Sequence, residues 1–193
     1  YDQIMRALKK FRGPKEGKSP VTVAMLYALC KDPNWETNVD DLAKYAAALV
    51  AFHFMLRSAE YCARLTGGRF DLDRVLRLCD VKFFLKGVQI HTNLECADQV
   101  EVTLGKQKCS LGGERRCHTA SPDVPDLCVV RILALFITRK GRSNPNLPLF
   151  TWVRGSKHAG DGVRYHDMRQ MAQRAAELCG RNTKDYATHS WRR

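Results

Sequence analysis

The apolar run 42–54 most constrains what this chain can fold into. It is rich in alanine, and its apolar residues lie nearly all round a helix. Residues suited to a helix start, Asn38 to Asp41, precede it. A helix that lacks a polar face has to be surrounded by other elements. We therefore expect it at the centre of the core, with the charged residues Arg57 and Glu60 directly after it.

The hydrophobic pattern changes twice along the rest of the chain. Helical periodicity predicts helices over 1–11, 22–30, 127–139 and 163–179, the last ended by Gly180, and one more opening near Thr188. Between 67–68 and 120 the pattern favours strands, at 75–84, 88–94 and 99–104, with 115–120 returning after a basic turn. Residues 149–152 are predicted as a short buried strand or anchor. The predicted fold is mixed, mainly α with a small antiparallel three-stranded sheet.

Length and composition indicate one folded domain. The chain has 193 residues and 45% hydrophobic content, enough for a single core. Gly and Pro are frequent in 12–20, so we expect residues 1–18 to be a connecting tail and 19–193 to be the domain. The longest apolar run, 45–56, is too short to span a membrane and contains His53, so no membrane association is expected.

The charge balance predicts a polyanionic partner. The chain carries 32 Lys and Arg against 20 Asp and Glu, a net charge of +12. The basic residues are spread between apolar runs rather than gathered in a tail, which favours a folded basic surface. Double-stranded DNA is the expected partner.

The cysteines do not indicate a disulfide scaffold. Of the 8 cysteines, Cys30, Cys62, Cys128 and Cys179 lie in apolar helical patterns, where cysteine acts as a small hydrophobic residue. No signal peptide is recognisable, so a reducing compartment, the nucleus or the cytoplasm, is expected. Zinc binding by Cys109, Cys117, His118 and Cys128 is the alternative, but no Cys-x-x-Cys pair supports it. We expect no metal and no cofactor.

Two short pairs point to phosphate chemistry. Arg57 and Glu60 are three positions apart, and so are His189 and Arg192. Two guanidinium groups can converge on one phosphate through planar pairs of donors, and an imidazole beside them can transfer a proton. Each pair by itself is more often an exposed ion pair or an accident of spacing than a site. Their joint occurrence is the stronger observation.

The order of these residues resembles the catalytic domain of the tyrosine recombinases, the phage-integrase family, which shares its core chemistry with type IB topoisomerases. The resemblance covers roughly 19–193 and includes 54–60, a lysine in a strand turn, 126–131 and 188–193. Its detail is most similar to recombinases carried by eukaryotic mobile elements. The fold that it implies is that of the DNA breaking-rejoining enzymes.

The resemblance implies a role for each residue. Arg57 and Arg192 would bind the non-bridging phosphate oxygens, His189 would act as an acid, base or hydrogen-bond donor, and Glu60 would orient Arg57. Lys108, in the turn 107–113, would protonate the departing 5′ oxygen, with Lys106 as the alternative. The DNA backbone would be contacted by Lys106, Arg115, Arg116 and Arg193. No metal or nucleotide is implied.

The resemblance also implies a nucleophile that this sequence does not place. The family's attacking tyrosine follows the His-x-x-Arg pair and forms a 3′-phosphotyrosyl link, and none of the 6 tyrosines stands in that position. We therefore expect the domain to be incomplete at its C-terminus, with the tyrosine beyond Arg193, and the chain itself to be inactive. The complete protein would be a DNA recombinase or integrase, for which a synaptic tetramer is the implied homo-oligomer.

Two other functions remain open at this point. An inactive relative of a recombinase could bind DNA through the same basic surface without cutting it. A helical interaction module, with accidental arginine and histidine pairs, is the other alternative.

Overall fold

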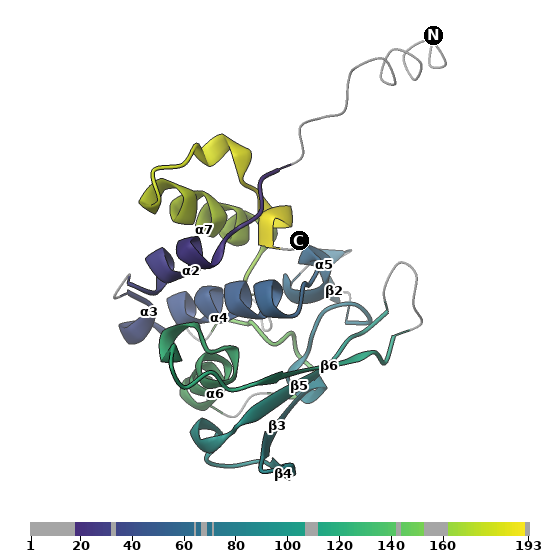
Figure 1. Cartoon of the computed structure of the whole chain (residues 1–193). Coiled ribbons are helices and arrows are strands. Elements are labelled where there is room, and N and C mark those ends of the chain that lie inside the picture. Colours follow the sequence, from purple (N-terminus) through teal and green to yellow (C-terminus); the bar gives the residue numbers. More distant parts are fainter. Residues whose placement is uncertain are drawn as a thin grey trace.

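The computed structural model describes residues 18–31, 34–63, 65–66, 69–70, 72–106, 112–141, 144–152 and 162–191. It shows a mixed α/β fold in which helices pack around one central helix and against an antiparallel sheet (Figure 1). The helix expected over 1–11 lies outside the described residues.

The central helix is α4 (Val39–His53), as the apolar run predicts. The Asn38 side chain accepts a hydrogen bond from the Asp40 amide at 2.9 Å and caps its start. Its side chains from Tyr45 to Ala51 are all buried, on every face of the helix. In Figure 1, α2 (Val23–Cys30) and α7 (Tyr165–Leu178) lie on one side of α4, and α6 (Val129–Lys140) and the sheet lie on the other.

The predicted helices at 22–30, 127–139 and 163–179 are present as α2, α6 and α7, with ends that shift by one or two residues. The short helix α3 (Asn34–Thr37) precedes α4, and its Trp35 stacks on Tyr45 at 5.0 Å between ring centroids. Gly180, with φ +65°, ends α7 as expected, because the left-handed backbone at a helix end favours glycine. Cys30, Cys62 and Cys128 are buried free thiols, as expected of small hydrophobic residues.

The expected three-stranded sheet is wrong, because the sheet has four strands. Its order is β4-β3-β5-β6, formed by β3 (Val81–Leu85), β4 (Val88–Ile90), β5 (Gln99–Thr103) and β6 (Arg115–Thr119). The returning segment β6 pairs with β5 along the full length of both strands and so adds a strand. Alternate β5 side chains, Val100 and Val102, are buried against the helices.

The structure also corrects one strand boundary, adds a hairpin, and decides between the two alternatives for 149–152. The first strand begins at Val81 rather than 75, because Leu78–Asp80 forms a 3-10 turn. A two-stranded hairpin, β1 (Leu65–Thr66) with β2 (Arg69–Phe70), was not predicted. Of the two alternatives for residues 149–152, the buried anchor is the one observed: Leu149, Phe150 and Thr151 are buried, the Leu149 amide donates to the Leu76 carbonyl at 2.8 Å, and Thr151 forms an isolated bridge with Gly162.

The last described element is short. The helix expected near Thr188 is a 3-10 turn, Thr188–Trp191, within the described residues. Trp191 is buried and its Nε1 donates to the Met168 carbonyl at 2.9 Å, so this turn is fastened to α7. The same turn is also bound by the Val21 amide, which donates to the Ser190 carbonyl at 2.7 Å.

No helix in the described part of the chain combines the length and apolarity that a membrane crossing needs.

Candidate functional site

Arg57 takes its position from the end of α4. The helix is closed by a hydrogen bond from the Leu56 amide to the Ala51 carbonyl at 2.9 Å. Met55 lies in the left-handed region at φ +53°, a conformation in which a residue other than glycine is strained. The chain then turns into the short helix α5 (Ser58–Tyr61), with Arg57 immediately before it.

Glu60 fixes Arg57 through both its backbone and its side chain. The carboxylate accepts the Arg57 amide at 2.7 Å and the Arg57 guanidinium at 3.3 Å. The Glu60 side chain is 8% exposed, whereas that of Arg57 is 40% exposed. A buried carboxylate therefore holds an arginine whose side chain is partly exposed.

Side chains from β6 bind the carbonyls that end α4. Nε2 of His118 donates to the His53 carbonyl at 2.9 Å, and the Arg116 guanidinium donates to the Phe54 carbonyl. Arg116 also pairs with Glu114 at 2.9 Å. A cation at the carboxyl end of a helix is favourable because the unpaired carbonyls there carry partial negative charge. The sheet therefore holds the turn that leads to Arg57.

A second imidazole lies at the same helix end. His53 and His118 meet edge to face at 5.2 Å between ring centroids, and Nε2 of His53 donates to the Leu127 carbonyl at 3.2 Å. Burial, followed by the neighbouring His118, lowers the pKa of His53. This histidine belongs to the packing of α4, as its place in the apolar run indicates.

His189 is carried on the exposed side of the turn 188–191, while Thr188 and Ser190 are buried. The Thr188 hydroxyl donates to the Tyr165 carbonyl at 3.1 Å, and the His189 ring meets the Tyr165 ring at 6.3 Å between centroids. The histidine therefore sits beside the start of α7 with its imidazole open to solvent.

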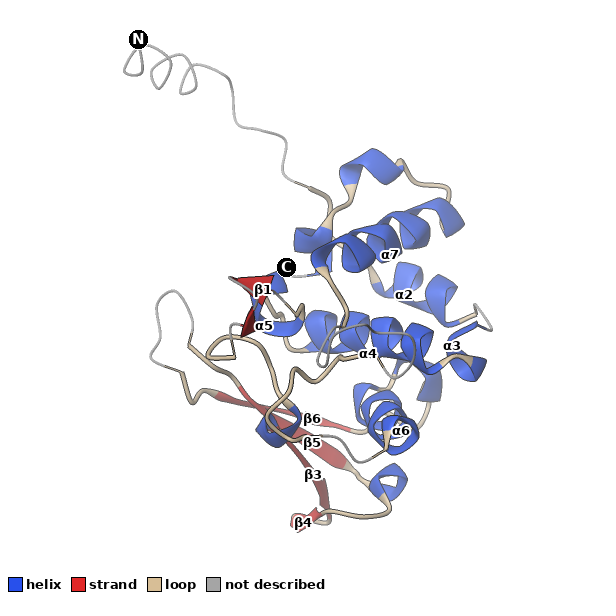
Figure 2. Cartoon of the chain, turned by 180° about the vertical axis from the view of Figure 1, so that it is seen from behind, coloured by secondary structure: helices blue, strands red, loops and turns tan. Residues whose placement is uncertain are grey.

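α5 and the histidine turn are linked through the residues that precede α7. The Ala63 amide donates to the Val163 carbonyl at 2.9 Å, two residues before Tyr165. Tyr61 of α5 is close enough to Tyr165 for the two phenols to interact electrostatically. In Figure 1, and from behind in Figure 2, both elements lie at the C-terminal end of α4. The fold thus brings Arg57, Glu60 and His189 into one region.

Tyr61 lies within this region, but it is buried. Its side chain is 1% exposed, and its hydroxyl has no hydrogen-bond partner among the described residues. Burial, with the nearby Cys62, Tyr165 and Glu60, raises the pKa of Tyr61. A neutral, enclosed phenol of this kind is poorly suited to attack a phosphate.

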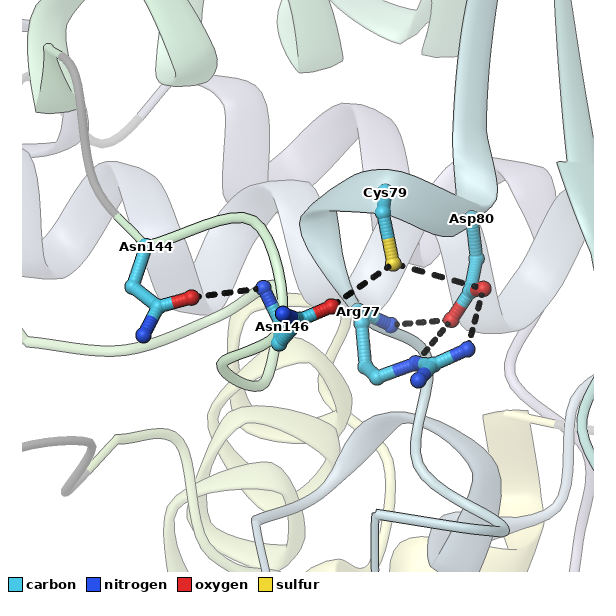
Figure 3. A network of polar contacts seen from close by, with 5 residues as sticks. All are labelled: Arg77, Cys79, Asp80, Asn144 and Asn146. Carbon is cyan, nitrogen blue, oxygen red and sulfur yellow. Dashed lines mark hydrogen bonds and ion pairs between the residues drawn. The ribbon is translucent and has the colours of Figure 1, made fainter.

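The loop after β2 contains a compact polar network (Figure 3). Arg77 binds Asp80 with a planar fork, Nε to Oδ2 and Nη2 to Oδ1, both at 2.9 Å. Cys79 lies between Asp80 and Asn146. The same loop is bound to the 144–149 segment through the Cys79 amide and the Pro145 carbonyl at 2.9 Å. This network fixes the loop against the rest of the fold.

The basic hairpin between β5 and β6 is described at its stem. Lys106 pairs with Asp73 at 2.9 Å, and this exposed pairing lowers the pKa of Asp73 through the hydrogen bond and the charge of Lys106. Arg115 is exposed, 4.0 Å from Glu101, and Arg116 is occupied at the end of α4. Lys108 lies outside the described residues.

The structure therefore places some of the predicted residues and not others. Arg57 and Glu60 are in contact, His189 lies on the turn 188–191 at the same end of α4, and Lys106, Arg115 and Arg116 belong to the hairpin. Arg192 and Arg193 lie outside the described residues, so the meeting of the two arginines stays a prediction. Sequence reasoning missed Tyr165, Asp73 and Arg77. Only Arg77, three positions before Asp80, has a local signal that could have identified it.

Among the described residues, no three His, Cys, Asp or Glu side chains gather as they would around a metal ion. Cys109, one of the four residues considered for zinc, lies outside the described residues.

No protein-family model matches the chain, and no curated protein does.

Proposed function

We propose that this chain carries the phosphate-binding and proton-transferring groups of a DNA strand-breaking and rejoining domain of the tyrosine-recombinase type. The observation that carries the proposal is the grouping of Arg57, Glu60 and His189 at one end of α4, although 129 positions separate Glu60 from His189. The basic hairpin between β5 and β6 is attached to the same helix end through Arg116 of β6 and the Phe54 carbonyl.

Each group has a role that its surroundings support. Arg57, whose side chain is 40% exposed, donates to a non-bridging oxygen of the scissile phosphate, while Glu60 prevents the arginine from turning away. His189, exposed on the turn 188–191 at the same end of α4, donates to a second oxygen or transfers a proton. Negative charge grows on these oxygens in the five-coordinate transition state, so fixed donors stabilise that state selectively.

The remaining roles rest on the resemblance alone. Arg192 supplies the second guanidinium, and Lys108, or Lys106 in its place, protonates the departing 5′ oxygen. Lys106, Arg115 and Arg193 contact the DNA backbone, and subunits assemble as a synaptic tetramer. No tyrosine follows His189 in this sequence, so a test of the site has to work without a protein nucleophile.

A nicked duplex with an activated 3′ end provides that test. The nick carries a 3′-p-nitrophenyl phosphate, which replaces the phosphotyrosyl ester, and a 5′ hydroxyl. The 5′ oxygen forms a bond to phosphorus, the bond from phosphorus to the aryl oxygen breaks, and the hydroxyl proton passes to a base. The joined strand appears on a gel, and the released nitrophenolate is measured by its absorbance.

The chain is expected to accelerate joining over the duplex alone. Arg57→Ala should slow it about 100-fold or more, the usual effect of removing one transition-state donor. The matched control is Arg174→Ala, because Arg174 also pairs with a glutamate three positions away, Glu177, but on the surface of α7. It should join at the wild-type rate.

Two results would contradict the proposal in different ways. If the wild-type chain binds the duplex and leaves the joining rate unchanged, the inactive DNA-binding domain is the better description. If it binds no duplex even at low salt, the helical interaction module is favoured.

A further inference from the structure

The stem of the β5–β6 hairpin is attached to the loop after β2, residues 72–80, through contacts between Lys106 of the stem and Asp73 of the loop. The stem consists of residues 104–106 and 112–114, closed by hydrogen bonds between Leu104 and both Gly113 and Glu114, each at 2.8 Å. Lys106 binds Asp73 twice, backbone amide to carbonyl at 2.7 Å and Nζ to Oδ2 at 2.9 Å. Lys106 is thus held both by its main chain and by its charge.

Gly105 permits the loop to approach this closely. A β-carbon at this position would clash with the Asp73 carbonyl oxygen and stand 3.1 Å from the carbonyl carbon. Both are backbone atoms, so no side chain could move aside to relieve the clash. A residue larger than glycine would therefore force the stem away from the loop.

The other end of the same loop is bound to α5. The Leu76 amide donates to the Glu60 carbonyl at 2.7 Å, and both Val75 and Leu76 are buried. Glu60 is the residue whose carboxylate holds Arg57. Three residues of extended chain span at most about 10 Å, so the loop sets a short distance between the stem and Arg57.

A second attachment joins the hairpin to the other side of Arg57. Arg116, on the returning strand β6, donates to the Phe54 carbonyl, three residues before Arg57. The hairpin is therefore bound to the chain on both sides of Arg57, to Phe54 directly and to Glu60 through residues 73–76. A cavity of about 240 Å³ lies between loop and stem, lined in part by Asp73, Arg77 and Lys106.

We propose that residues 73–76 form a strut that sets the position of Lys106 and the hairpin stem relative to Arg57, with Asp73 and Gly105 as positioning residues. This inference rests on the proposed function. A reaction that needs an arginine and a lysine on one phosphate depends on their separation, and a displacement of about 1 Å can lower a rate about 100-fold.

Gly105→Ala tests the strut without changing any charge. Joining of the activated nick should slow at least about tenfold at saturating duplex, while the Kd for the duplex changes less than about twofold. Gly87→Ala is the control, because Gly87 lies in the β3–β4 turn with φ +80° and nothing within 4 Å of an added β-carbon. It tolerates a β-carbon only with backbone strain, yet touches neither loop nor stem, and should join at the wild-type rate.

Hydrogen exchange gives a readout that does not need catalysis. In Gly105→Ala, the Lys106, Leu76 and Arg57 amides should all exchange faster than in Gly87→Ala. If only the Lys106 amide changes, the strut does not couple the stem to Arg57 and the inference is overturned. If Gly105→Ala does not fold, Asp73→Asn replaces it. The side chains of Asp73 and Lys106 are both largely exposed, so this substitution should not prevent folding.

In Asp73→Asn the Lys106 amide should exchange faster and the joining rate should fall a few-fold, with no loss of DNA affinity. Unchanged exchange and unchanged rate would overturn the strut. If the wild-type chain joins no nick, both the proposed function and the role of the strut in it are contradicted. A wild-type chain that joins while Gly105→Ala joins equally well overturns the strut alone.

Discussion

At the scale of single residues, the site depends on a strained residue followed by a buried carboxylate. Met55 adopts a left-handed backbone that allows the chain to leave α4 sharply, and Glu60 then receives the Arg57 amide. Neither feature binds a ligand directly. Together they determine where the partly exposed side chain of Arg57 lies.

Met55→Gly should stabilise the protein. A non-glycine residue in the left-handed region costs about 1–2 kcal/mol, and glycine avoids this cost but loses more chain entropy on folding. The Met55 side chain is largely exposed, so little packing is lost. The expected net gain is about 0.5–1 kcal/mol in the free energy of unfolding, measured by urea denaturation. Lys86→Gly should likewise raise the free energy of unfolding, because Lys86 in the β3–β4 turn also has a left-handed backbone, at φ +51°. A loss of stability in Met55→Gly alone would mean that its side chain packs against the protein.

At the scale of elements, side chains from the sheet determine how α4 ends. Arg116 and His118 alternate with the exposed Arg115 and Cys117 along β6, so both face the helix. They lie more than 60 positions from the carbonyls that they bind. The basic segment 115–118 therefore divides its charges between the surface and the interior.

Another cation, Lys140, is half-buried at the end of α6. Lys140 donates to the Leu149 carbonyl at 2.7 Å and lies 5.6 Å from the Phe136 ring centroid. Burial lowers the pKa of Lys140 to about 8. The ordinary lysine pKa is about 10.4, so between these values the unfolded chain binds a proton that the folded chain does not.

The free energy of unfolding should therefore fall as the pH is lowered from about 10.4 to 8, and change no further through this group below that range. Lys140→Met lacks this dependence. The stability of Lys140→Met relative to wild type should rise as the pH falls through the window, measured by denaturation at each pH. Thiols and phenols titrate in both proteins and cancel in the difference. A constant difference would show that Lys140 keeps its ordinary pKa.

Local sequence patterns were sufficient to predict some of the helices and strands and not others. α2, α4, α6 and α7 could be predicted because each has its own apolar periodicity and a recognisable end, such as Asn38 or Gly180. The strand count could not be predicted, because pairing between β5 and β6 depends on register across a turn. The first strand was predicted too early because a 3-10 turn and a buried strand end look alike in hydropathy.

In the candidate site, too, local contacts could be predicted from the sequence and long-range contacts could not. Arg57 with Glu60 could be identified because their contact is local, at three positions. Asp73 and Tyr165 could not, because each acquires its importance from a residue far along the chain, Lys106 and His189 respectively. Arg116 was expected at the DNA, and its structural contact with Phe54 has no signal in the sequence.

At the scale of the whole molecule, the net charge of +12 is the feature most relevant to a partner. Several arginines are paired locally with carboxylates, among them Arg57, Arg77, Arg131 and Arg174. An excess of unbalanced positive charge nevertheless remains, and it attracts polyanions over a distance set by salt.

Binding to a short DNA duplex should therefore weaken steeply with salt. The logarithm of the binding constant is expected to fall linearly with the logarithm of KCl concentration, by about 0.9 for each phosphate neutralised. Arg115→Gln, at the exposed edge of β6, should reduce the slope by about 1, and Arg174→Gln should leave it unchanged. Fluorescence anisotropy over a series of salt concentrations provides the measurement. A slope near zero would mean that the basic surface does not contact phosphates.

The pairing of Val21 with Ser190 has a practical consequence. The amide of Ser19 is likewise bound by the carbonyl of Asp185, so an extended segment near the beginning of the chain braces the turn that presents His189. A shortened version that starts after Val21 would lose both braces. Any tag or cleavage site is thus better inserted before Ser19, where it leaves the imidazole undisturbed.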